Sequence, residues 1–306
     1  MGSLSEPARV KRLLEWRAQA LAMAKAAGIP AEEVEILLKD KLGWGPLQRL
    51  MGRAPRDELE ELAPGQDGDP LQAVQALWRR RLEERIPLQY LLGKVEWAGL
   101  ELQVTPAVLI PRPETELLLE QATLWLQAHP VPQGSYFADL GTGSGALAVA
   151  LAHSHPQVQL LAVDLSPQAL AVAAANVATH HLQERVKLLQ GSWFEPLVPW
   201  RGQIRGLLSN PPYIPSAELP HLMPEVRLHE PRLALDGGED GLACLRLLIR
   251  EAPDYLAPNS LWAVEVMQGQ APWVAEQLQV MGCYQQIHVH RDLAGIERVV
   301  SAQFTG

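Results

Sequence analysis

The segment Leu207–Pro215, with the sequence LLSNPPYIP, places an amide and an aromatic ring directly after an apolar run. Because Pro211 and Pro212 cannot donate to a sheet ladder, a buried strand has to end at Asn210. The fixed φ angles of the prolines also hold the neighbouring backbone carbonyl rigidly. A stiff corner that carries Asn210 and Tyr213 predicts a site for a planar group with N–H donors.

The chemistry of such a corner follows from the weak nucleophilicity of amides and exocyclic amines, whose nitrogen lone pair is delocalised. The side-chain oxygen of Asn210 and the backbone carbonyl of Pro211 can each accept one N–H and so orient the nitrogen. The ring of Tyr213 can stack on the planar group. Catalysis would then be positioning and electrostatics without a covalent intermediate. We therefore predict these catalytic and substrate-binding residues: Asn210, Pro211, Pro212 and Tyr213.

A glycine-rich turn, FADLGTGSG at Phe137–Gly145, joins a predicted strand to a predicted helix. Such a turn lets the backbone and the free helix amides approach a ligand closely. Asp164 ends the next apolar strand, about 20 residues later, where doubly wound sheets bind ribose hydroxyls. The two features together predict an adenosine-type cofactor. The alternative is that Asp164 only caps the helix beginning near Pro167.

The identity of the cofactor depends on the spacing of this loop. Its sequence GTGSG differs from the GxGxxG of dinucleotide sites. Asp139, just before it, suits an ammonium or a sulfonium better than a pyrophosphate. S-adenosylmethionine is therefore favoured, bound by the residues of the turn and the strand ends: Asp139, Gly141, Thr142, Gly143, Ser144, Gly145, Asp164, Leu165 and Asn210.

The elements that position these residues alternate between strand and helix from Ser135 onward. Alternation of this kind predicts a parallel sheet covered on both faces. The last two strands read as an antiparallel pair, which indicates a seven-stranded sheet with one reversed edge strand. The predicted strands are Tyr136–Leu140, Val158–Leu165, Val186–Gln190, Ile204–Ser209, Leu261–Val266, Gln286–Arg291 and Arg298–Phe304. The fold class is therefore α/β, a Rossmann-like domain.

The preceding residues predict a helical unit and a connection. Helices are expected over 10–27, 31–41, 56–62 and 69–85, and the segment 95–109 alternates like a hairpin broken by Gly99. We divide the chain into a helical domain over 1–86, a β-hairpin linker over 87–112 and a methyltransferase domain over 113–306.

Composition narrows the class of protein. A hydrophobic fraction of 47% and a charged fraction of 20% are typical of a globular protein. The two cysteines favour a reducing cytoplasm over a disulfide framework, and neither a membrane span nor a metal site is expected. Residues 1–85 carry 14 basic and 14 acidic side chains, whereas residues 86–306 carry 12 basic and 21 acidic ones. This charge argues against nucleic acid as a partner.

Several motifs in order give the chain a resemblance to a known family. They are IPRPETELL, DLGTGSG, DLS, GSWF, SNPPYI, HEPRLALDGGEDGL and RDLAGIERVV, with PLQYLLG upstream. Together they resemble the protein-(glutamine-N5) methyltransferases of peptide-chain release factors, also called the HemK or PrmC family. The resemblance is strong over residues 85–306 and is limited to architecture before them.

The resemblance implies methyl transfer from S-adenosylmethionine, which leaves S-adenosylhomocysteine, to the glutamine of the Gly-Gly-Gln motif of class-I release factors. It implies that Gly141–Gly145 follow the methionine part, that Asp164 holds the ribose, and that Ser192 and Trp193 bind the cofactor at the adenine, with Trp193 packed beside it. Arg112 and Glu114 would lie near the site as substrate-binding residues, and the helical domain would hold the release factor.

Two positions depart from the family pattern. Ser192 stands where the family often has an acid, and Met267 stands where a glycine is usual after the fifth strand. Three functions remain open at this point. A nucleic-acid amino-methyltransferase is the main rival, and a non-catalytic module that keeps the cofactor site is the third. A monomer is expected because no oligomerisation face is evident.

Overall fold

A computed structural model describes residues 6–51 and 69–306. The chain divides into two compact units, Met1–Leu92 and Gly93–Gly306, and each is described by itself. One predicted helix, over residues 56–62, lies outside the described residues.

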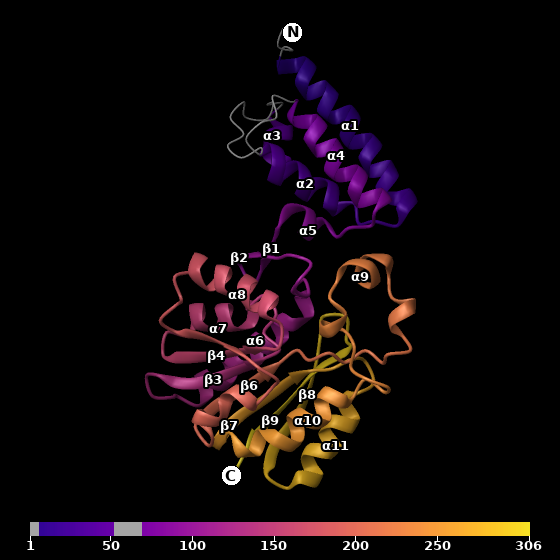
Figure 1. Ribbon diagram of the computed structural model, residues 1–306. Coiled ribbons are helices and arrows are strands. Elements are labelled where there is room, and N and C mark those ends of the chain that lie inside the picture. Colours follow the sequence, from indigo (N-terminus) through magenta and orange to yellow (C-terminus); the bar gives the residue numbers. More distant parts are fainter. Residues whose placement is uncertain (1–5, 52–68) are drawn as a thin grey trace. The chain divides into compact units, whose positions relative to one another are not determined.

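The first unit is helical in its described part (Figure 1). Asp69 caps one helix by accepting the backbone N–H of Leu71 at 3.1 Å, as the Asp-Pro start of that helix predicts. The buried Trp16, Trp44 and Trp78 belong to its core. The helices are α1 (Glu6–Ala27), α2 (Glu32–Leu42), α3 (Pro46–Leu50), α4 (Pro70–Glu83) and α5 (Leu88–Leu92).

The second unit begins with an antiparallel hairpin of β1 (Lys94–Trp97) and β2 (Leu100–Gln103). Ala98 and Gly99 form its two-residue turn and both have positive φ, as a type I′ turn requires. The predicted hairpin was longer, since residues 104–109 continue as irregular chain rather than strand. The short helix α5 lies in the range that the sequence predicted as linker.

A seven-stranded sheet forms the centre of this unit, in the order β5-β4-β3-β6-β7-β9-β8. The order turns at β3, the first parallel strand in the chain, whose neighbours are β4 and β6. The strands are β3 (Ser135–Leu140), β4 (Val158–Asp164), β5 (Val186–Gln190), β6 (Ile204–Ser209), β7 (Leu256–Glu265), β8 (Tyr284–Arg291) and β9 (Glu297–Phe304).

The position of the reversed strand corrects one sequence prediction. β9 pairs antiparallel with both β7 and β8, so the reversed strand is one place in from the edge and β8 is the edge strand. The pattern of the sequence identified two closing strands but did not order them. Their order depends on which strand pairs with β7, which is a tertiary choice.

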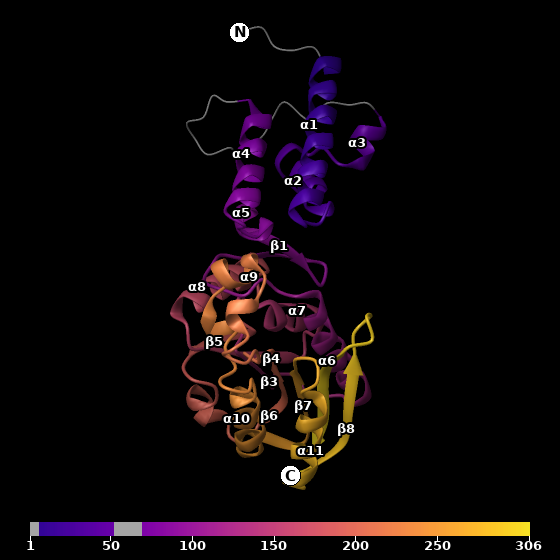
Figure 2. The same ribbon diagram turned by 90° about the vertical axis from the view of Figure 1, so that its right-hand side faces the viewer.

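Helices cover both faces of the sheet (Figures 1 and 2). Successive residues of β3 alternate between the two cores, with Phe137 in one and Ala138 in the other, as the two-residue period of a strand requires. One core contains α6 (Glu116–Ala128), α7 (Ala146–Ser154) and α8 (Pro167–Thr179), and the other contains α10 (Ala243–Glu251) and α11 (Ala271–Met281). A further short helix, α9 (Pro224–His229), lies between β6 and α10 and was not predicted.

The arrangement places the predicted site at one edge of the sheet. The carboxyl ends of β3, β4 and β6 are adjacent, because these strands are parallel neighbours. Doubly wound sheets bind ligands in the crevice at the point where the strand order reverses, which here is β3. The glycine-rich turn, Asp164 and Asn210 each follow one of these strand ends.

Candidate functional site

A cavity of about 450 Å³ opens at these strand ends. Its volume lies in the range of small-molecule sites. Among the residues that the sequence predicted, the wall contains Asp139, Gly141, Thr142, Gly143, Ser144, Asp164, Leu165, Ser192, Trp193, Asn210 and Pro212. The structure therefore gathers most of the predicted cofactor residues around one space.

The glycine-rich turn is held to Asp164 by its own backbone. The backbone N–H of Gly143 donates to Asp164 Oδ2 at 2.8 Å, and the N–H of Ser166 donates to Oδ1 at 2.9 Å. Ser166 is the residue that caps α8, by accepting the N–H of Ala169. Asp164 is thus not the cap of this helix, and its carboxylate lies in the cavity wall beside the turn.

Gly145 explains why the turn ends in glycine. Its φ of +78° is in the left-handed region, and an added Cβ would lie 3.1 Å from the Cβ of Ala173 in α8. Any other residue would be strained at this φ and crowded by the helix. Gly145 itself is outside the cavity wall, so its role is to close the turn rather than to contact a ligand.

Asp139 is a buried carboxylate at the end of β3, with 2% of its surface exposed. It accepts the hydroxyl of Thr142 at 2.6 Å. Burial raises its pKa from 3.8 to about 6, although the bonds from Thr142 and the backbone of Ala148 oppose this shift. A cation in the cavity would offset the cost of the buried charge, so Asp139 favours a positively charged ligand group.

Asn176 of α8 fixes the far side of the turn. Its Nδ2 donates to the carbonyls of Ser144 and Gln103, at 2.8 and 3.0 Å, and its Oδ1 accepts the N–H of Gln103 at 2.6 Å. The side chain is fully buried. It therefore ties the glycine-rich turn to strand β2 of the hairpin.

Trp193 and Asn210 approach the glycine-rich turn from two other loops. A Cβ added to Gly141 would lie 3.8 Å from the Trp193 ring and 3.9 Å from the carbonyl oxygen of Asn210. Trp193 has a φ of +49°, which is strained for a bulky residue. The cofactor turn and the Asn-Pro-Pro-Tyr corner are thus in direct contact.

The loop over residues 236–241 packs against this corner. A Cβ atom added to Gly237 would lie 2.8 Å from the carbonyl carbon of Tyr213. One added to Gly241 would lie 2.3 Å from the carbonyl oxygen of the same residue. Gln270 donates to the same Tyr213 oxygen at 3.1 Å. These contacts explain why the DGGEDG stretch has glycine at 237 and 241: the absence of a side chain at these positions leaves room for the backbone of the corner.

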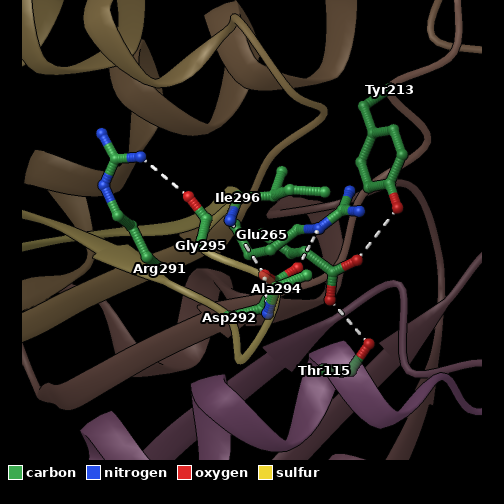
Figure 3. Close-up of polar contacts among 9 residues, drawn as sticks. Thr115, Tyr213, Glu265, Arg291, Asp292, Ala294, Gly295 and Ile296 are labelled. Atoms are coloured by element: carbon green, nitrogen blue, oxygen red, sulfur yellow. Dashed lines mark hydrogen bonds and ion pairs between the residues drawn. The ribbon is translucent and has the colours of Figure 1, made fainter.

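A chain of hydrogen bonds holds the side chains of the corner (Figure 3). Asn210 Nδ2 donates to Thr115 Oγ1 at 3.0 Å, and Thr115 Oγ1 donates to Glu265 Oε2 at 2.6 Å. The phenol of Tyr213 donates to the other carboxylate oxygen of Glu265 at 2.9 Å. Burial and the charge of Glu265 raise the pKa of Tyr213, so its phenol stays protonated.

Four predicted residues besides Gly145 are outside the cavity wall: Pro211, Tyr213, Arg112 and Glu114. Tyr213 lies behind the wall and is directed to Glu265. Arg112 forms a 2.5 Å ion pair with Glu230, whose carboxylate is 1% exposed. This pair joins the segment before α6 to the loop that follows β6. Arg112 therefore connects two segments beside the cavity through this ion pair, rather than facing the cavity itself.

Sequence reasoning missed Thr115 and Glu265. Thr115 was part of the IPRPETELL motif but was given no role, and Glu265 was not among the predicted site residues. A signal for Glu265 was present, because it is an acid at the end of an apolar strand, as Asp139 and Asp164 are. Thr115 had no such signal beyond its place in the PRPETE stretch.

The two departures from the family pattern have clear positions. Ser192 is in the cavity wall, and its backbone N–H donates to Glu195 at 3.1 Å. Met267 lies outside the wall and does not have the positive φ that would require glycine. Its N–H donates to Gln270 Oε1 at 2.9 Å, so the methionine is accommodated without backbone strain.

Metal ligation and membrane crossing find no candidate groups or helices among the described residues. Over 6–51 and 69–306, no group of three or more His, Cys, Asp or Glu side chains is arranged to hold a metal ion. Among the helices of these same ranges, none combines the length and the apolar character that crossing a bilayer would need.

Comparison with known proteins gives one family-model match, described as "Methyltransferase small domain", over residues 115–223. The chain is 48% identical to the release factor glutamine methyltransferase of Synechocystis sp., covering 94% of this chain and 95% of that protein. It is also 48% identical to the protein of the same name from Gloeobacter violaceus, covering 93% and 94%.

A solved structure supports the fold independently. The catalytic domain of hMettl16, solved in complex with MAT2A 3'UTR hairpin 6, matches with a TM-score of 0.53 over 77% of this chain and 81% of that one. At 14% identity this match concerns the fold alone. Because the chain is 48% identical to each of the two curated relatives over nearly their full length, it belongs to the release factor glutamine methyltransferase family.

Proposed function

We propose that this protein transfers a methyl group from S-adenosylmethionine to the side-chain amide nitrogen, N5, of the glutamine in the Gly-Gly-Gln motif of class-I release factors. Its membership of the family supports this activity. The observation that carries it is the place of Asn210, in the cavity wall and against the turn at Gly141. An acceptor for amide N–H groups thus adjoins the predicted cofactor site.

The residues present fit S-adenosylmethionine. The buried Asp139 suits the ammonium or sulfonium charge, Asp164 can accept two ribose hydroxyls, and the Trp193 ring offers a flat apolar surface to the adenine. When bound, this cofactor supplies an electrophilic methyl group on a sulfonium, and it leaves as S-adenosylhomocysteine. Leu165 and Ser192 complete the cavity wall on the side of Trp193.

The task of the corner is to present the glutamine nitrogen. The side-chain oxygen of Asn210 and the carbonyl of Pro211 each accept one N–H of the substrate amide. Pro211 and Pro212 keep that carbonyl in place because their φ angles are fixed. The amide nitrogen gains the methyl group, and the proton that it loses, which is acidic once the nitrogen is alkylated, passes to solvent. We assign no general base, since the corner acts by orientation and electrostatics.

An exocyclic amine of adenine or cytosine is the second candidate substrate, because the same corner would accept its N–H groups. Charge opposes it: residues 86–306 carry 21 acidic side chains against 12 basic ones. Phosphate binding would need an excess of lysine and arginine. The likeness to hMettl16 concerns the fold alone and adds nothing for this substrate.

Three further expectations belong to this proposal. Residues 1–86 would help to hold the release factor, with Arg112 and Glu114 near the entering glutamine. The enzyme would work in the cytoplasm, where translation takes place, and both Cys244 and Cys283 are free, as a reducing compartment requires. A monomer is proposed, with sedimentation as the measurement that checks it.

The test is methyl transfer from labelled S-adenosylmethionine to a purified class-I release factor. A matched control carries alanine in place of the glutamine of the Gly-Gly-Gln motif. Label on the normal factor and none on the control is the expected result. If neither factor is labelled while the cofactor binds normally, the proposal fails, and DNA and RNA containing adenine or cytosine become the substrates to assay.

A further inference from the structure

Glu265 is the least expected charged group near the cavity. It ends β7 and is 1% exposed, yet it carries a carboxylate. A carboxylate only accepts hydrogen bonds, so both hydroxyls that contact it, from Thr115 and Tyr213, have to be the donors. Figure 3 shows the two hydroxyls on the two oxygens of this carboxylate. Its acceptor sites thus fix where two protons point.

The proton of Thr115 determines the orientation of the Asn210 amide. A threonine hydroxyl has one proton, and Thr115 gives it to Glu265. The oxygen of Thr115 can therefore only accept from its next neighbour, the Asn210 amide 3.0 Å away. That neighbour has to be the NH₂ group and not the oxygen. The amide orientation follows from the hydrogen-bond chemistry rather than from a choice between two similar atoms.

This orientation leaves the other end of the amide for a ligand. Among the described residues, none is hydrogen-bonded to Asn210 Oδ1, although both Asn210 and Thr115 line the cavity. If Thr115 had no acceptor behind it, its hydroxyl could donate to Asn210 instead. The amide would then be free to turn, and its oxygen would no longer be reserved for an incoming N–H.

We propose that Glu265 and Thr115 are positioning residues that lock the side chain of Asn210 with its oxygen directed at the substrate amide. The same carboxylate holds Tyr213, so the two ends of the Asn-Pro-Pro-Tyr corner are coupled through one group. This inference rests on the proposed function for its substrate, but the orientation of Asn210 does not depend on it.

The bonded neighbours of Glu265 favour the accepting, ionised form that the relay needs, but they only partly offset burial, which is the largest influence on its pKa. Burial raises its pKa, whereas the bonds from Thr115 and Tyr213 and the charge of Arg298 lower it. Arg298, on the adjacent strand β9, is itself held by a 2.9 Å bond to Asp292. Glu114 is the acidic neighbour that acts in the opposite sense.

The matched variants are Thr115→Val, which keeps the β-branched shape without the hydroxyl, and Thr115→Ser, which keeps the hydroxyl. We expect Thr115→Val to lower kcat by about 10- to 100-fold, as for loss of a charge-linked hydrogen bond. Thr115→Ser should retain activity. In both variants the dissociation constant of S-adenosylmethionine should stay within about 3-fold of the wild-type value, which is less than the loss of one charge-assisted hydrogen bond would cause. A similar loss in both variants would mean that the shape of Thr115, not its hydroxyl, matters, which would overturn the proposal.

A double-mutant cycle separates positioning from general packing. If Thr115 acts through Asn210, Thr115→Val should cost less than about 2-fold in an Asn210→Ala background, since non-additivity marks residues in one network. An equal loss in both backgrounds would contradict the proposal. Glu265→Gln, measured in the same assay, should also lower kcat. A glutamine side chain has one accepting oxygen, and its NH₂ group cannot accept the second hydroxyl proton. Wild-type activity of this variant would contradict it too.

A readout independent of methyl transfer is the hydrogen exchange of the Asn210 side-chain amide, followed by NMR in ¹⁵N-labelled protein. Its NH₂ should be protected in the wild type and in Thr115→Ser, and should exchange faster in Thr115→Val. Protection that is unchanged in Thr115→Val would overturn the proposal. Because this signal needs no substrate, a failure of the proposed function would appear only in the transfer assay with the release factor.

Discussion

The glycine-rich turn after β3 and the Asn-Pro-Pro-Tyr corner after β6 share one cavity wall, but different contacts hold them. The turn is fixed by bonds within itself, where Gly145 donates to the carbonyl of Thr142 at 2.8 Å and Thr142 donates to Asp139, and by Asp164 and Asn176 of the next strand and helix. The corner is fixed from afar, by Thr115 before α6 and by Glu265 at the end of β7.

This difference suggests a division of labour. A turn held by its own bonds and by the next strand and helix is complete once two successive strand–helix units have formed, which suits a site for a cofactor that is the same in every reaction. A corner held by side chains from several segments is assembled only when the whole sheet is complete. Substitutions should therefore separate the two regions, with cofactor affinity depending on one and the rate of transfer on the other.

The largest effect is expected for Asn210→Ala. Removing one preorganised hydrogen-bonding group at a reacting centre costs about 10²- to 10³-fold in kcat. The assay is methyl transfer at saturating S-adenosylmethionine. Cofactor affinity, measured by calorimetry on the same preparation, should change by less than about 3-fold, because no charge is removed from the turn. A comparable loss of affinity would break the division between turn and corner.

For Asp164→Ala we expect a smaller effect, on the affinity for the cofactor rather than on kcat. Its carboxylate would lose the bonds to the cofactor ribose, so the dissociation constant should rise by about 10- to 100-fold. The value of kcat at saturating cofactor should stay close to that of the wild type. Gln190, which pairs with Asp164 across the β4–β5 ladder, offers a control outside the cavity wall: Gln190→Ala should leave affinity unchanged.

The same contrast explains what the sequence could predict. The turn, Asp164 and Asn210 follow apolar strands directly, so each was recognisable from residues within a few positions of it. The relay was not recognisable, because Asn210 and Thr115 are 95 residues apart and Thr115 and Glu265 are 150 residues apart. The pairing of such groups depends on strand order, and strand order is decided by packing.

The fold shows the same limit. Strand and helix types followed from hydrophobic periodicity, and the position of β6 beside β3 followed from the doubly wound pattern. The place of β9 did not follow, because the pattern of the sequence did not determine which of the two closing strands pairs with β7. Helix α9 was missed as well: its six residues lie in a loop rich in proline, and short helices give a weak periodic signal.

The prediction for Asp139 concerns stability rather than activity, and it tests whether the buried carboxyl of the turn stores unfavourable energy in the ligand-free protein. Burial raises the pKa of Asp139 from 3.8 to about 6. A raised carboxyl pKa favours the folded state at low pH. The folded protein therefore loses stability as the pH rises from 3.8 through 6, because the buried group has to ionise. Asp139→Asn should remove this loss.

We therefore expect Asp139→Asn to raise the free energy of unfolding of the ligand-free protein by about 3 kcal/mol at pH 7, since each pKa unit corresponds to about 1.4 kcal/mol. Near pH 4 the two proteins should be almost equal. The measurement is denaturant unfolding at both pH values. S-adenosylmethionine should bind the variant more weakly, since its positive charge would meet no carboxylate.

Asp236 provides a control of opposite sign in the same cavity wall. Bonds from Ser216, Gly238 and Arg232 lower its pKa, so its contribution to stability is present at neutral pH and is lost as the pH falls. Asp236→Asn should thus destabilise the protein at pH 7, where Asp139→Asn stabilises it. If Asp139→Asn had the same effect at pH 4 and pH 7, ionisation of the buried carboxyl would not be the cause. The turn would then differ from the corner, where burial raises the pKa of Glu265 even though each of its carboxylate oxygens accepts a hydroxyl proton.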